Sequence, residues 1–124
     1  MPRILVVDDS PPILMLLSRL LSEEGYEVGT AKNGAEAVQL LQSQSFDLMI
    51  SDINMRPVNG VELLRKTRKS YPEMAVVMLT AYETMFTADQ AAENGAFAYI
   101  VKPFKSGALL QTVQCALEHN GAAA

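Results

Sequence analysis

The sequence feature that most constrains the fold is a series of short apolar runs separated by longer segments with helical periodicity. Three runs are continuous rather than alternating, namely residues 4–7, 48–50 and 75–79. Continuous runs of this length are typical of strands buried on both faces, as in a parallel sheet. The segments 26–30 and 97–101 have a less regular pattern of the same kind. The chain therefore predicts five strands.

Five further segments have the spacing of helices. Ser10 followed by two prolines is a good start for the first of them, with the serine as the cap. The second and third begin with an asparagine and have a glutamate three residues later, the spacing of a capping box (Asn33 with Glu36, Asn59 with Glu62). Strict alternation of strand and helix predicts right-handed crossovers and helices on both faces of the sheet. The expected fold class is α/β, an open doubly wound sandwich.

Composition limits the classes of function. A chain of 124 residues forms one domain, and 49% hydrophobic residues are enough for a core. A net charge of −4 without a basic cluster argues against direct nucleic-acid binding. The single cysteine excludes an intrachain disulfide and a multi-cysteine metal site. With neither a membrane-length apolar run nor a signal-peptide pattern at the N-terminus, we expect a cytoplasmic domain without membrane contact.

The side chains that could take part in catalysis or metal binding follow the predicted strands. Asp8 and Asp9 follow the first strand, Asp52 the third, Thr80 the fourth and Lys102 the fifth. In an open α/β sheet, ligands bind beyond the carboxyl ends of the strands, where the strand order reverses. If the first and third strands are neighbours, three carboxylates meet in one crevice.

Such a cluster of carboxylates needs a compensating positive charge. Two carboxylates ~4 Å apart repel by about 4 kcal/mol at an effective dielectric constant of about 20. A proton or a cation has to offset this repulsion, and Mg²⁺ suits one or two carboxylates together with water and a phosphate oxygen. Aspartate can also act as a nucleophile that forms an acyl phosphate. Asp52 stands alone on its turn and is the best nucleophile candidate, which leaves Asp8 and Asp9 to hold the metal.

At this point the chain resembles a known family, the receiver domain of bacterial two-component response regulators (the CheY-like superfamily), from about Arg3 to His119. The resemblance depends on four short motifs: Val7-Asp8-Asp9-Ser10, Ser51-Asp52, Thr80-Ala81 and Lys102-Pro103-Phe104. It implies a flavodoxin-like (βα)5 fold with the sheet order 2-1-3-4-5. We therefore expect a receiver domain over residues 1–119, with residues 120–124 as a C-terminal tail or the start of a linker.

The resemblance also implies the chemistry of the site. Asp52 would accept a phosphoryl group from a sensor histidine kinase or a histidine phosphotransfer protein. Asp9 and Asp52 would bind Mg²⁺ directly, Asp8 would bind it mostly through water, and the backbone carbonyl of Asn54 would be a further ligand. The domain would be a signalling switch that catalyses only its own phosphorylation and dephosphorylation.

The switch implied by the resemblance involves residues beyond the metal ligands. Thr80 and Lys102 would contact the phosphoryl oxygens, and Tyr99 would turn inward as Thr80 moves. The Lys102–Pro103 peptide bond would be a candidate for the cis form. The surface of the fourth helix, fifth strand and fifth helix would then contact an output domain or downstream protein, and a homodimer would be an option after phosphorylation. Arg56 departs from the family pattern, in which proline usually occupies its place.

Two other functions fit parts of the pattern. A magnesium-dependent phosphohydrolase with an aspartyl nucleophile usually has Asp-x-Asp after its first strand, whereas this chain has Asp8-Asp9-Ser10. A flavodoxin-like nucleotide binder needs a phosphate-binding loop rich in Ser, Thr or Gly, and two carboxylates at that position would repel phosphate. Each aspartate alone would be an ordinary turn or cap residue. The joint placement of the motifs favours the receiver domain.

Overall fold

The computed structural model describes residues 2–52, 60–80, 95–102 and 104–123. Within these residues nine elements follow one another: β1 (Arg3–Val7), α1 (Pro11–Glu23), β2 (Glu27–Ala31), α2 (Gly34–Ser43), β3 (Leu48–Asp52), α3 (Gly60–Ser70), β4 (Ala75–Thr80), β5 (Ala98–Val101) and α5 (Ser106–Ala123). The fourth predicted helix lies between the apolar segments 75–79 and 97–101, and most of it falls within residues 81–94, outside the described residues.

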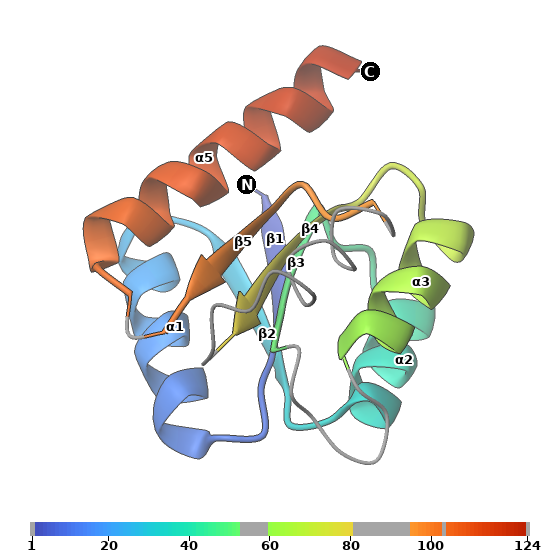
Figure 1. Ribbon diagram of the computed structural model, residues 1–124, viewed down its shortest axis with the longest axis horizontal. Coiled ribbons are helices and arrows are strands. Elements are labelled where there is room, and N and C mark those ends of the chain that lie inside the picture. The colour runs from blue at the N-terminus through green and yellow to red at the C-terminus, as the bar shows by residue number, and fades with distance from the viewer. Residues whose placement is uncertain (1, 53–59, 81–94, 103, 124) are drawn as a thin grey trace.

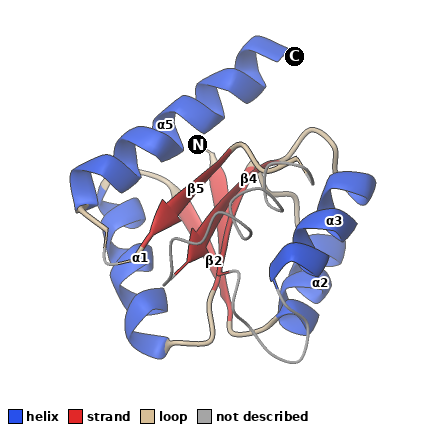
Figure 2. Cartoon of the chain, in the orientation of Figure 1, coloured by secondary structure: helices blue, strands red, loops and turns tan. Residues whose placement is uncertain are grey.

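The five strands form one parallel sheet in the order β2-β1-β3-β4-β5. Helices α1 and α5 lie on one face of this sheet, and α2 and α3 lie on the other (Figures 1 and 2). The predicted flavodoxin-like sandwich with the order 2-1-3-4-5 is thus confirmed. Because β1 and β3 are neighbours, their carboxyl ends lie side by side at one edge of the sheet, the carboxyl edge.

The apolar runs make two cores, one on each face of the sheet. Because successive strand residues point to opposite faces, each buried strand contributes to both cores. Leu5 and Met49 pack toward α2 and α3, whereas Ile4 and Leu48 pack toward α1 and α5. This two-sided burial explains why the strand sequences are continuously apolar.

The starts of the helices follow the expected chemistry only in part. Asn33 caps α2 as predicted, since its side chain accepts a hydrogen bond from the backbone N–H of Glu36 at 2.9 Å. The glutamate side chain, however, accepts from the backbone N–H of Lys32 at 3.1 Å rather than from the cap residue itself. Ser10 is the N-cap residue of α1, as predicted. The prediction that its side chain caps the helix is wrong, because this side chain makes no capping hydrogen bond. Its backbone N–H instead donates to the carboxylate of Asp8.

Element boundaries differ slightly from the predicted ones. Strand β2 begins at Glu27 because the backbone N–H of Tyr26 donates to the carbonyl of Leu21 at 3.2 Å, in the turn that follows α1. Strand β5 begins at Ala98, one residue later than expected. Residues 120–123, expected to form a tail or linker, continue α5. The domain boundary at residue 119 stays a prediction.

Replacing Asn33 with alanine is expected to lower the free energy of unfolding by about 1 kcal/mol, because the N–H of Glu36 loses its capping acceptor. Urea denaturation of the wild type and the variant measures this loss. Asn33→Asp keeps a capping oxygen and should recover most of the stability. Equal unfolding free energies for the wild type and Asn33→Ala would show that the cap contributes nothing.

Candidate functional site

Three aspartates meet at the carboxyl edge of the sheet. Asp52 is the last residue of β3, and Asp8 and Asp9 directly follow β1, which is hydrogen-bonded to β3. One carboxylate oxygen from each of the three lies within 4.8 Å of the others. The expected convergence of these carboxylates is confirmed.

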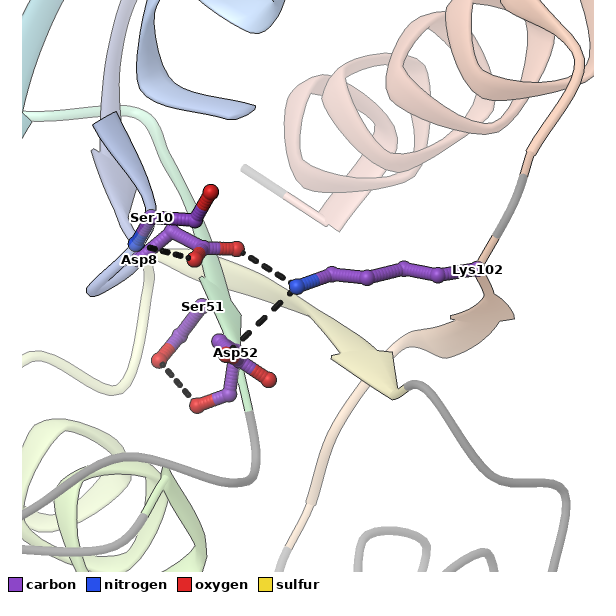
Figure 3. A network of polar contacts seen from close by, with 5 residues as sticks. All are labelled: Asp8, Ser10, Ser51, Asp52 and Lys102. Carbon is purple, nitrogen blue, oxygen red and sulfur yellow. Dashed lines mark hydrogen bonds and ion pairs between the residues drawn. The ribbon is translucent and has the colours of Figure 1, made fainter. Parts of the chain in front are cut away.

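Asp8 is the innermost member of the cluster, with 0% of its surface exposed. Its Oδ1 accepts a hydrogen bond from the backbone N–H of Ser10 at 2.9 Å, and its Oδ2 lies 2.8 Å from Nζ of Lys102 (Figure 3). Both oxygens of this carboxylate therefore have a partner within the protein. Asp9, in contrast, is exposed and faces solvent.

Lys102 brings a positive charge to the cluster from the end of β5, the outermost strand on one side of the sheet. It directly follows β5, and its backbone N–H donates to the carbonyl of Thr80 at 2.7 Å. Its Nζ lies 3.5 Å from Oδ2 of Asp52 in addition to its contact with Asp8 (Figure 3). Among the described residues, Lys102 thus pairs with two of the three clustered carboxylates, which leaves negative charge in excess in this part of the site. Oxygen donors with excess negative charge fit a hard divalent cation such as Mg²⁺.

The other predicted site residues lie on β4 and β5 or outside the described residues, and their roles stay predictions. Thr80 is buried at the end of β4, two strands away from Asp8. Tyr99 lies on the edge strand β5 and is 42% exposed, so it presents much of its surface to solvent. Asn54, Arg56 and Pro103 lie outside the described residues. Three statements therefore stay predictions: the backbone carbonyl of Asn54 as a metal ligand, the role of Arg56 in the loop after Asp52, and the cis form of the Lys102–Pro103 peptide bond.

Sequence reasoning missed one residue of this region as a functional candidate. Ser51 is 0% exposed, and its hydroxyl donates to the main-chain carbonyl of Asp52 at 3.3 Å (Figure 3). The signal in the sequence was a serine inside a strand that is otherwise continuously apolar up to the aspartate.

Comparison with known proteins identifies the family. The family model of the response regulator receiver domain matches residues 4–114. The chain belongs to this family. Among curated relatives, the transcriptional regulatory protein GlrR of Escherichia coli is 39% identical over 120 residues, which are 97% of this chain and 27% of the relative. This receiver domain thus spans about a quarter of the length of the curated relatives that it matches.

Solved structures give the same result. A CheY-like receiver domain from Methanospirillum hungatei has a TM-score of 0.96 and 33% identity, with 100% of this chain and 99% of that chain covered. The response regulator TrrA of Thermotoga maritima, solved in complex with Mg²⁺-BeF, has a TM-score of 0.85 and 40% identity, with 94% and 99% covered. Within the described residues of this receiver domain, none of the helices has the length and apolarity needed to cross a membrane.

Proposed function

We propose that this receiver domain is a phosphorylation-dependent switch in which Asp52 accepts the phosphoryl group. The observation that supports this most directly is the meeting of three aspartates with Lys102 at the carboxyl edge of the sheet. A carboxylate nucleophile, two further acidic groups and a fixed ammonium are the parts that phosphoryl transfer to aspartate requires, since catalysis there consists mainly of positioning and charge neutralisation.

In the proposed reaction, a carboxylate oxygen of Asp52 forms a bond to phosphorus. The bond between phosphorus and an imidazole nitrogen of the donor breaks, its electron pair stays on the imidazole, and an acyl phosphate results. Asp9 and Asp52 would hold Mg²⁺ directly, together with the backbone carbonyl of Asn54, and Asp8 would act mostly through water. When bound, Mg²⁺ offsets the negative charge of the phosphoryl oxygens.

Lys102 would change partners during this reaction. In the structure its ammonium group lies between Asp8 and Asp52. A phosphoryl group on Asp52 offers new anionic oxygens within reach, which Lys102 would contact along with the hydroxyl of Thr80. The backbone N–H of Lys102 donates a hydrogen bond to the carbonyl of Thr80, so movement of either residue would displace β5 and with it Tyr99. These contacts are our proposed route from the site to the surface.

The partners follow from this role. We propose that a sensor histidine kinase or a histidine phosphotransfer protein supplies the phosphoryl group in the cytoplasm. The output partner would bind the face that includes β5 and α5, and a homodimer of phosphorylated chains would use the same face. The relative GlrR is a transcriptional regulatory protein of which this chain matches about a quarter, and this similarity favours an output in gene regulation. Catalysis would be limited to the domain's own phosphorylation and dephosphorylation.

Incubation with Mg²⁺ and acetyl phosphate is expected to add the mass of one phosphoryl group to the wild type and none to Asp52→Asn. Beryllofluoride, a stable phosphoryl mimic, should shift NMR resonances at β5 in the wild type alone. Asp47→Asn, which alters an aspartate at the opposite edge of the sheet, serves as the control and should still form the adduct. Multiple turnover of a small phosphate ester without an adduct would instead favour a phosphohydrolase.

A further inference from the structure

Ser51 is a buried polar residue that the proposed function does not use. Five polar or charged side chains are buried among the described residues. Three of them belong to the carboxyl-edge site, and a fourth, Thr67, donates its hydroxyl to a carbonyl of its own helix at 3.0 Å. Ser51 is the fifth, and it lies directly before the proposed phosphoacceptor.

The surroundings of Ser51 are apolar. Its register neighbours on the adjacent strands are Val7 and Met78, and both are fully buried, as is Met49 two residues earlier in β3. Burying a hydroxyl in such a place costs free energy unless the group is hydrogen-bonded. Because strand residues alternate between faces, the side chain of Ser51 lies on the opposite face from that of Asp52. The hydroxyl therefore acts on the main chain rather than on the carboxylates.

The contact that compensates the buried hydroxyl is with the proposed phosphoacceptor itself. Oγ of Ser51 donates to the carbonyl oxygen of Asp52 at 3.3 Å, a long and correspondingly weak hydrogen bond (Figure 3). This carbonyl belongs to the last residue of β3. We infer that Ser51 is a positioning residue, whose hydroxyl fixes the main chain of Asp52 so that its carboxylate stays beside those of Asp8 and Asp9. The inference rests on the proposed function, because it takes Asp52 as the reacting group.

The matched variants Ser51→Thr and Ser51→Val test this inference. Both add bulk at the same buried position and have nearly the same shape, but only threonine keeps the hydroxyl. Relative to Ser51→Thr, Ser51→Val should shift the ¹³C resonance of the Asp52 carbonyl. It should also weaken Mg²⁺ binding and slow phosphorylation by acetyl phosphate by about two- to fivefold, the effect of one weak hydrogen bond. If the added bulk prevents folding, Ser51→Ala, which removes the hydroxyl without adding bulk, is compared with the wild type instead.

The outcomes separate the two proposals. Equal Mg²⁺ dissociation constants and equal phosphorylation rates for the threonine and valine variants would overturn the positioning role, even if both variants melt at lower temperature. An unchanged carbonyl resonance would overturn the contact itself. If the wild type forms no adduct that depends on Asp52, the proposed function fails. The carbonyl resonance and the Mg²⁺ titration still decide the role of Ser51 in that case, because neither requires phosphorylation.

Discussion

Replacing Lys102 with alanine is expected to lower the free energy of unfolding by about 2–4 kcal/mol when divalent ions are absent. The carboxylate of Asp8 is completely buried, and Oδ2 lies 2.8 Å from the ammonium group. Removing one partner of a buried ion pair costs about 3–5 kcal/mol, because the other charge is left without compensation. The side chain of Lys102 is 17% exposed, so water reaches part of the site. For this reason we place the expected loss near the lower end of that range, at about 2–4 kcal/mol.

Urea denaturation with and without Mg²⁺ measures this effect. Added Mg²⁺ should stabilise Lys102→Ala more than the wild type, because the cation restores positive charge beside Asp8 and Asp52, the two carboxylates that have lost their ammonium partner. Lys105→Ala removes an exposed lysine three residues away and serves as the control. If the two variants are equally stable without Mg²⁺, the contact between Lys102 and Asp8 contributes nothing to folding.

Replacing Asp9 with alanine is expected to raise the Mg²⁺ dissociation constant by more than about 100-fold. Even groups that only orient a metal ligand are worth about 10–100-fold in affinity, and Asp9 is proposed as a direct ligand. Its carboxylate lies within 4.8 Å of the other two, yet the residue is exposed. Without metal, the variant should be as stable as the wild type or slightly more stable, because one of three like charges is removed.

Isothermal titration of Mg²⁺ into both proteins checks the affinity, and urea denaturation checks the stability. Glu24→Ala removes an exposed carboxylate at the end of α1 and should leave Mg²⁺ affinity unchanged. An Asp9→Ala protein that binds Mg²⁺ as tightly as the wild type would remove Asp9 from the set of ligands.

The fold was predictable because its determinants are local patterns. Continuous apolar runs such as residues 75–79 identify strands buried on both faces, and strict alternation with helices leaves few ways to arrange them. The meeting of Asp8, Asp9 and Asp52 followed from the same arrangement, since strand ends in a parallel sheet lie at one edge. What the apolar pattern left open was whether the first and third strands are adjacent, and the structure shows that they are.

The contacts within the site were less predictable, because they depend on side-chain conformation. The sequence favoured Ser10 as a capping side chain, but Asp8 lies two residues earlier and bonds the backbone N–H of that serine instead. This local bond holds one oxygen of the carboxylate and leaves the other for Lys102, which is 94 residues away in the chain. Residue spacing alone does not decide which of these side chains makes a local hydrogen bond to the backbone.

The position of β5 has a consequence for how the site can rearrange. Strand β1, which Asp8 and Asp9 directly follow, and strand β3, which ends at Asp52, each have a strand on both sides. Within the part of the chain that the structure describes, β5 pairs with β4 alone. Segments at a sheet margin open at lower free energy than those in its middle. The acidic groups are thus attached to inner strands, and the ammonium that partly offsets their charge is attached to an edge strand, which can shift with the loss of fewer inter-strand hydrogen bonds.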